Sequence, residues 1–332
     1  MSSETIKSAP ASAPVIDVLP GPSVQSRVLR AALQVTVRPV LQAWGALSNL
    51  PWPYGVIDTV ATPLRPISGT RVRQRKLTNC GAEWVRAPHT DSDRVLLYLH
   101  GGAFICCGLR THRRLVSRIS RACEAPALSI DYRMLPDTPI SDSVEDCLDG
   151  YQLLLDLGYR NDQIVFVGDS AGGYMALMTA IVAHERGIGY PAAIVCQSPF
   201  VDTDPHRKLE RLGDVRDPLF PANGLESLTE LMTKVERERG ELDGQGKVRT
   251  PLDADLSEMP PVLIQAGADE LLVVDAELIA AEIADQGADC TLQLFDGQFH
   301  VFQAAADLIP EGQQAIDMIG DFVRGRVPAQ RT

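Results

Sequence analysis

Short apolar runs alternate with helical segments over most of this chain, from about residue 70 onward. Several runs, among them VLLYL at 95–99 and IVFV at 164–167, are apolar on both faces, as is typical of parallel strands covered by helices on both sides. The alternation predicts an open α/β fold. Strands are expected at 72–77, 82–86, 95–99, 127–130, 164–167, 194–197, 262–265 and 291–295, and helices at 112–123, 141–157, 171–187 and 275–287.

Three segments depart from this alternation. Residues 1 to about 25 are rich in Ser, Pro and Ala, which predicts a mobile tail. Residues 27–50 have apolar side chains at helical spacing with a break near Pro39, which predicts one or two short amphipathic helices. A polar stretch at 200–258 separates two of the expected strands, and a connection of that length is typical of a functional insertion or lid.

Composition narrows the function classes. The chain has 332 residues, and 31 basic against 43 acidic residues give a net charge of −12. Such a balance argues against a broad nucleic-acid surface and gives no overall attraction to an anionic membrane. No apolar run reaches about 18 residues and the N-terminus lacks the pattern of a signal peptide, so neither a transmembrane helix nor a secretory leader is expected.

The cysteines indicate the compartment. There are 7 of them, their spacing is irregular, and no Cys-x-x-Cys pair occurs. This pattern predicts neither a disulfide framework nor a zinc site and favours a reducing, cytoplasmic location. Cys106 and Cys107 are expected to serve in packing, because nothing nearby suggests a positive site with an adjacent base.

The segment Gly168-Asp169-Ser170-Ala171-Gly172 follows the strand IVFV and opens a helical stretch. In a strand–turn–helix setting, Gly-x-Ser-x-Gly is typical of a nucleophilic serine, because the sharp turn exposes the side chain and the glycines avoid clashes with neighbouring backbone. The helix N-terminus also favours developing negative charge. The alternative is a glycine-rich turn in which Ser170 only caps the helix.

A second glycine-rich segment, HGGAF at 100–104, follows the strand VLLYL. Glycines let the main chain fold over a site with its N–H groups pointing inward, and an oxyanion requires such donors. Gly101, Gly102 and Ala103 are therefore candidates for an oxyanion hole, together with the N–H of Ala171. An ordinary tight turn is the alternative.

His300 lies in a loop after the last expected strand, from which it can reach over the sheet edge toward Ser170. It is the expected general base. The other histidines are assigned elsewhere: His100 braces the glycine loop, His112 and His184 are solvated on helices, His89 lies in a polar turn and His206 in the insertion.

A carboxylate is needed to orient the histidine and to stabilise its charged form. Asp269 follows the strand at 262–265 and precedes His300, so we expect it to fill this role. Glu270 and Asp275 are competitors. Glu270 is expected to point elsewhere, and Asp275 to cap the next helix.

Together these segments resemble the hormone-sensitive-lipase-like group of α/β-hydrolase carboxylesterases, over about residues 70 to 305. The matching segments are HGGAF (100–104), DYRMLP (131–136), VEDC (144–147), GDSAGG (168–173), QAGADELL (265–272) and the His300 loop. The resemblance implies an eight-stranded, mostly parallel sheet with helices on both faces and a helical cap. Residues 1–60 would form the tail and cap helices, and 61–332 the catalytic domain, with a cap insertion at about 200–258.

The resemblance also implies an activity: hydrolysis of short- to medium-chain acyl esters through an acyl-serine intermediate, without cofactor or metal. Carried over, Ser170 is the nucleophile, Asp269 the orienting acid and His300 the base. The implied partner is a small-molecule ester, with no nucleic acid and no membrane span, and a homodimer is left open. The family usually has a third glycine where this chain has Ala103, whose methyl group would narrow the acyl site.

The residues leave other functions open. A lactonase, amidase or thioesterase uses the same triad, whereas a silent ligand-binding protein on this fold typically lacks one member of it. A true lipase acts at an oil–water interface, which the acidic chain and an aromatic content of 5% do not indicate. The apolar residues of the expected cap either line a substrate pocket or only pack the helices against the core. These residues are Leu29, Leu33, Leu41, Trp44 and Trp52.

Overall fold

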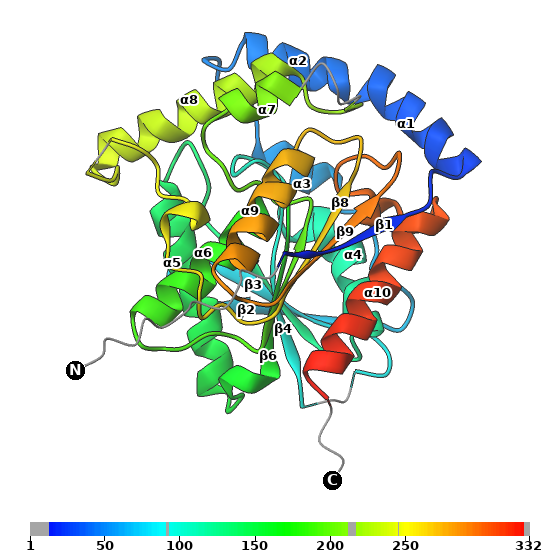
Figure 1. Cartoon of the computed structure of the whole chain (residues 1–332), viewed down its shortest axis with the longest axis vertical. Coiled ribbons are helices and arrows are strands. Elements are labelled where there is room, and N and C mark those ends of the chain that lie inside the picture. The colour runs from blue at the N-terminus through cyan, green and yellow to red at the C-terminus, as the bar shows by residue number, and fades with distance from the viewer. Residues whose placement is uncertain (1–12, 91–92, 212–216, 245, 329–332) are drawn as a thin grey trace, which may run out of the picture.

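The computed structural model describes residues 13–90, 93–211, 217–244 and 246–328 (Figure 1). The strands are β1 (Val15–Leu19), β2 (Arg71–Lys76), β3 (Gly81–Arg86), β4 (Val95–Leu99), β5 (Ala127–Asp131), β6 (Ile164–Asp169), β7 (Ala193–Gln197), β8 (Val262–Gly267) and β9 (Cys290–Phe295). They form one sheet in the order β1-β9-β8-β7-β6-β4-β5-β3-β2. The pairing is parallel except for β2 with β3 and β3 with β5.

The predicted α/β fold is confirmed, and every expected strand is present with bounds shifted by at most about two residues. The structure adds β1, which pairs in parallel with β9 and places Val15 opposite Thr291. The prediction of a mobile tail up to residue 25 is therefore wrong for residues 15–19, where the run VIDVL is rich in β-branched residues. Residues 1–12 lie outside the described part of the chain.

Helices cover both faces of the sheet. They are α1 (Val24–Thr36), α2 (Arg38–Ala46), α3 (Gly55–Val60), α4 (Leu109–Ala122), α5 (Ile140–Asp156), α6 (Ala171–Glu185), α7 (His206–Arg211), α8 (Ala222–Arg239), α9 (Val273–Asp285) and α10 (Pro310–Arg326). Helices α5, α6 and α9 pack on one face, and α4 and α10 on the other. Alternate residues of β4 divide accordingly, with Leu97 in the first core and Leu96 in the second.

Helices α1, α2 and α8 form a cap over one end of the sheet (Figure 1). It joins the N-terminal segment to the insertion at 200–258, because α2 packs against α8 and Ser227 Oγ donates a hydrogen bond to Gly45 O over 2.8 Å. The two helices approach so closely that a Cβ at Gly45 would lie 2.7 Å from Gly224 N. The expected break between the first two helices falls at Val37, and Pro39 lies in the first turn of α2.

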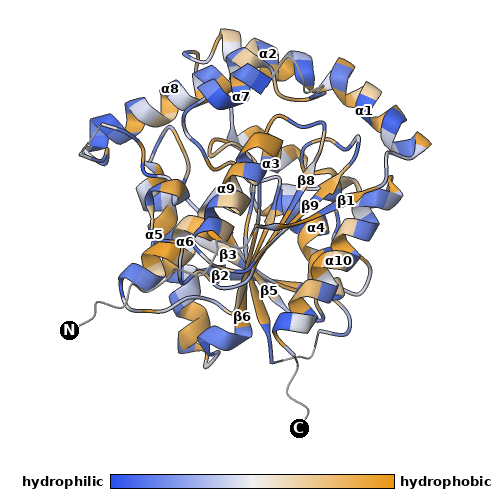
Figure 2. Cartoon of the chain, in the orientation of Figure 1, coloured by the Kyte–Doolittle hydropathy of each residue, from blue (hydrophilic) through white to orange (hydrophobic). Residues whose placement is uncertain are grey.

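Hydropathy follows these layers. Apolar residues dominate the central strands in Figure 2, whereas the cap helices carry a mixture of apolar and polar residues. Strands β4, β6 and β7 are buried along their whole length. Within the described residues, no helix combines the length and the apolar character needed to span a bilayer.

Candidate active site

Ser170 lies in the turn between β6 and α6, as the motif predicts, and has a φ of 54°. A non-glycine residue is strained in this conformation, which makes its side chain project from the tip of the turn. The neighbouring glycines are required, because a Cβ at Gly168 would lie 2.0 Å from Gly172 O, and one at Gly172 would lie 1.9 Å from Leu99 O. Ser170 is 6% exposed and lines an apolar cavity.

The loop after β4 lies directly against this turn. A Cβ at Gly101 would lie 2.3 Å from Asp169 Oδ2 and 3.1 Å from Ser170 Cβ, so only glycine permits the approach. The next residues, Gly102 and Ala103, have φ values of 128° and 54°. Within the described residues, no backbone acceptor takes the N–H of Gly102 or Ala103. These groups are thus available to a developing oxyanion.

Two aromatic rings brace this loop from beneath. His100 is buried, its Nδ1–H donates to Gly101 O over 2.8 Å, and its ring stacks on Tyr132 with centroids 4.3 Å apart. The Tyr132 hydroxyl donates in turn to His100 O over 2.5 Å. Burial lowers the pKa of His100 to about 4, which keeps the ring neutral at ordinary pH. The structural role expected for His100 agrees with these contacts.

The acid beside His300 differs from the expected one. His300 Nδ1 lies 2.7 Å from Glu270 Oε2, and Glu270 is completely buried. Glu270 Oε1 also accepts the N–H of Gly267 over 3.0 Å, which fixes the carboxylate. The prediction that Asp269 orients the histidine is therefore wrong, and Glu270 holds that position.

The turn after β8 explains the exchange. Asp269 points outward, with 34% of its side chain exposed, and forms an ion pair with Arg30 of α1. The longer side chain of Glu270 turns back beneath the loop that carries His300. Sequence reasoning missed this choice because both residues follow the same strand, and the one discriminating signal, the arginine that engages Asp269, lies on a distant helix. Asp275, the other competitor, forms a buried ion pair with Lys208.

The serine and histidine turns share one support, the end of β7. The N–H of Ser170 donates to Gln197 O over 2.8 Å, and the next residue, Ser198, accepts the N–H of Val301 through its Oγ over 3.0 Å. Ser170 and Val301, the neighbour of His300, are therefore held by two adjacent residues at the end of β7. Phe220, which lines the cavity, packs edge-on against the His300 ring with centroids 4.7 Å apart.

A buried polar cluster lies behind the serine, and sequence reasoning missed it. His112 Nε2 lies 3.1 Å from Asp169 Oδ2, and Tyr98 donates to Asp169 Oδ1 over 2.6 Å. The expectation that His112 is solvated is wrong, since only 12% of its side chain is exposed. Burial opposes the imidazolium, but contact with Asp169 outweighs this and raises the pKa of His112 to about 9. The pair is thus ionised at neutral pH.

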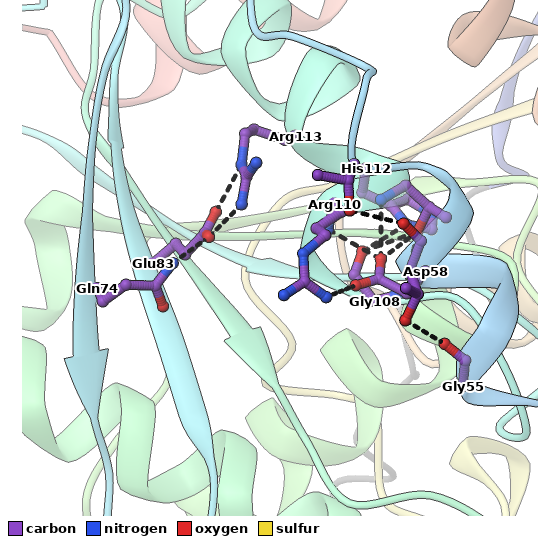
Figure 3. A network of polar contacts seen from close by, with 11 residues as sticks. Gly55, Asp58, Gln74, Glu83, Gly108, Arg110, His112 and Arg113 are labelled. Carbon is purple, nitrogen blue, oxygen red and sulfur yellow. Dashed lines mark hydrogen bonds and ion pairs between the residues drawn. The ribbon is translucent and has the colours of Figure 1, made fainter.

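Helix α4, which carries His112, is also held to the cap by Asp58 of α3 (Figure 3). Asp58 Oδ1 accepts the N–H groups of Arg110 and Thr111, each over 2.9 Å, at the start of α4. A carboxylate at a helix N-terminus satisfies free donors and complements the helix dipole. Because His112 follows in the next position, α3 is coupled to the cluster behind Ser170.

The apolar cavity has a volume of about 270 Å³ and lies between the cap and the serine turn. Its walls come from α2, α3, α8 and the loop after β4, and they include Leu41, Trp44 and Trp52. Leu29 and Leu33 instead pack against a small core around Phe299. Leu41, Trp44 and Trp52 therefore line the cavity, whereas Leu29 and Leu33 only pack the helix against the core.

Comparisons with known proteins agree with this architecture. Residues 96–304 match a family model described as the alpha/beta hydrolase fold. Esterase LipU of Mycobacterium tuberculosis is 39% identical over 295 residues, which cover 87% of this chain and 99% of that protein. The carboxylesterase/phospholipase LipF of the same organism is 37% identical over 317 residues, covering 94% and 84%.

Solved structures give the same result. The crystal structure of an esterase from the bacterial hormone-sensitive lipase family has a TM-score of 0.78 at 29% identity, covering 92% of this chain and 99% of that one. The chain belongs to the hormone-sensitive-lipase-like α/β-hydrolases and is a carboxylic ester hydrolase.

Proposed function

We propose that this hydrolase cleaves acyl esters through an acyl-serine intermediate, with Ser170 as nucleophile, His300 as base and Glu270 as orienting acid. The hydrogen bond between His300 and Glu270 is the observation that carries the proposal. It selects the tautomer in which His300 Nδ1 bears the proton, leaving Nε2 free to accept the serine proton. The support at the end of β7, which contacts both Ser170 and Val301, favours an approach of this histidine to the nucleophile.

The reaction then has two halves. Ser170 Oγ attacks the ester carbonyl as His300 takes its proton, and the resulting oxyanion accepts hydrogen bonds from the N–H groups of Gly102, Ala103 and Ala171. The C–O bond breaks, and His300 protonates the departing alcohol. Water then attacks the acyl-serine with His300 again as base, releasing the acid and restoring the serine. Gly101 has a different role in this scheme, because it lets the donor loop approach Asp169.

The acyl group is proposed to be of short to medium length. The cavity is small and its lining is almost wholly apolar, from the floor at Ser170 and Ala171 to the wall at Leu225 and Leu228. Apolar lining favours a hydrocarbon chain over a polar acyl group. The volume of about 270 Å³ limits the length that fits without rearrangement.

The test combines labelling with turnover. A serine-directed organophosphonate should modify one peptide, that containing Ser170, and Ser170→Ala should abolish hydrolysis of p-nitrophenyl esters while leaving the circular dichroism spectrum unchanged. Ser257→Ala, at an exposed serine, is the matched control and should retain full activity. Labelling at another serine, or full activity of Ser170→Ala, would overturn the assignment. Amides and thioesters of the same acyl group, assayed in parallel, define which bond is cleaved.

A further inference from the structure

Two adjacent cysteines follow the glycine-rich loop after β4. The Sγ atoms of Cys106 and Cys107 are 3.8 Å apart, which is within hydrogen-bond distance for two sulfur atoms. Cys106 packs in part against the main core, in keeping with the packing role expected of it. Both cysteines are nevertheless only partly buried, and Cys106 also lines the apolar cavity. A small reagent that enters the cavity therefore meets one member of a pair of thiols.

The pair is in contact with Gly102, whose N–H is one of the proposed oxyanion donors. Cys106 Sγ donates a hydrogen bond to Gly102 O over 3.3 Å, and the N–H of Cys106 donates to the same oxygen over 3.0 Å. A Cβ at Gly102 would lie 1.9 Å from Cys106 O and 3.0 Å from Cys107 Cβ. The backbone of the two cysteines thus lies so close to Gly102 that a movement of one displaces the other.

The surroundings favour reaction at Cys106. A hydrogen bond from Cys107 lowers the pKa of Cys106, because the donated proton stabilises the thiolate. The same hydrogen bond and burial raise the pKa of Cys107, which therefore stays protonated, whereas the imidazolium of His112 acts in the opposite direction. A thiolate that is reachable, with a second thiol and a cation nearby, is typical of cysteines that are sensitive to oxidation.

We propose that Cys106 and Cys107 form a modification site at which hydrogen peroxide produces a disulfide, and that this disulfide switches off ester hydrolysis. The Cys106 thiolate attacks one peroxide oxygen, so that an S–O bond forms, the O–O bond breaks, and the released hydroxide takes up a proton to become water. Cys107 then attacks the sulfur of this sulfenic acid. The S–S bond forms, the S–O bond breaks, and a second water leaves with the proton of Cys107. One peroxide is thereby reduced to two water molecules while two thiols are oxidised.

The disulfide must move the donor loop. Its two sulfur atoms lie about 2 Å apart, so the Sγ atoms have to approach each other well inside their present 3.8 Å. Cys106 Sγ then has no proton to donate to Gly102 O, and the backbone against Gly102 shifts. The effect on hydrolysis rests on the proposed function, in which the N–H groups of Gly102 and Ala103 are aligned before the reaction. Formation of the disulfide does not depend on that function.

Peptide mass spectrometry tests the disulfide without reference to activity. Trypsin releases residues 95–110 as one peptide, which contains Cys106, Cys107 and no other cysteine. After treatment of the reduced full-length protein with hydrogen peroxide and then iodoacetamide, this peptide should have lost two hydrogen atoms and carry no alkyl group. Dithiothreitol should restore both alkylation sites. Ser170→Ala should form the disulfide as the parent does, because the reaction does not use the serine.

Hydrolysis of a water-soluble acetyl ester gives the second measurement. Peroxide should lower kcat of the parent about tenfold or more, with a smaller change in KM, and dithiothreitol should restore it. Cys107→Ser should start at the parent rate and form no disulfide, and dimedone should then label Cys106 as the sulfenic acid. Cys80→Ser, at another partly buried cysteine, is the matched control and should respond to peroxide as the parent does.

Two results for the peptide would overturn the proposal: both thiols remain reduced under peroxide, or the disulfide joins Cys106 to a cysteine of another peptide. An unchanged kcat in protein that carries the disulfide would show that the pair does not control hydrolysis. Failure of the proposed function has a different signature, because Ser170→Ala would then hydrolyse the ester before any peroxide is added.

Discussion

The two walls of the cavity are built on different principles. Helix α6, which begins next to Ser170, buries 12 of its 15 residues, whereas α2 of the cap buries only Trp44 among 9. The wall that carries Ser170 is fixed by the core of the protein. The cap is instead held by a few polar ties, among them Arg30 with Asp269 and Asp58 with the start of α4. Changes in the first wall should alter rate, and changes in the second should alter selectivity.

The largest effect is expected at the carboxylate of the triad. Glu270→Gln should lower kcat about 10³- to 10⁴-fold, because an amide cannot stabilise the imidazolium and favours the wrong histidine tautomer. Asp269→Asn is the matched change and should keep kcat within about threefold, since an ion pair with a partly exposed carboxylate contributes little. Steady-state kinetics on one ester measure both. The reverse ranking would restore Asp269 to the role first expected of it.

The next effect concerns the ion pair behind the nucleophile. The folded-state pKa of His112 is about 9, above the ordinary value of 6.5. Its contribution to stability is therefore complete below pH 6.5 and is lost as the pH rises through about 9, by about 3 kcal/mol in all. Urea unfolding from pH 6 to 10 should show this decline in the parent. His112→Gln should be less stable at pH 6 and lack that part of the decline.

Exposed His184 supplies the control for this experiment, because its side chain is 41% exposed. His184→Gln should follow the parent at every pH. A parallel decline in parent and His112→Gln between pH 6.5 and 9 would mean that the buried pair is not the source of the pH dependence.

A smaller effect is expected at the far wall of the cavity. Leu228→Ala on α8 should lengthen the space available to the acyl chain and raise the octanoyl-to-acetyl ratio of kcat/KM about tenfold. Leu231→Ala, on the same helix but outside the cavity lining, should leave the ratio unchanged. Rates across p-nitrophenyl esters of increasing length measure the ratio. Equal effects of the two changes would indicate loosening of α8 instead of a longer pocket.

The smallest effect is expected at Ala103, the departure from the usual family glycine. Its φ of 54° suits glycine, so Ala103→Gly relieves strain and removes a methyl group from the cavity lining. Esters of branched alcohols should gain about threefold in kcat/KM relative to esters of primary alcohols. Thermal unfolding measures the relief of strain, and competition between the two ester types measures the change in selectivity. No change in that selectivity would place the methyl group away from the alcohol.

Most of the fold could be predicted because its signals are local. A few adjacent residues are enough to predict a buried strand at IVFV and a tight turn in the glycine-rich segment around Ser170. Gly101 could be identified from its own motif, HGGAF, although the turn that requires its close approach lies at Asp169 and Ser170, far along the chain.

The failures share a different origin. The selection of Glu270 over Asp269 depends on Arg30, which lies 239 positions away in the chain. The burial of His112 depends on Asp169, 57 positions away, because its own helix is rich in arginine and predicts a solvated face. The strand at Val15–Leu19 exists only because β9 offers it an edge. In each case the partner, and not the residue itself, determines the outcome.

The first strand also changes what a shortened protein would do. Leu19 O accepts the N–H of Asp296, and a Cβ at Gly297 would lie 2.5 Å from Pro22. Both contacts fasten the segment that leads to His300. A truncation that removes these residues to open the pocket would therefore also loosen the loop that carries His300. We expect such a variant to accept larger substrates but to turn them over slowly. The beginning of the chain thus supports the loop that carries His300.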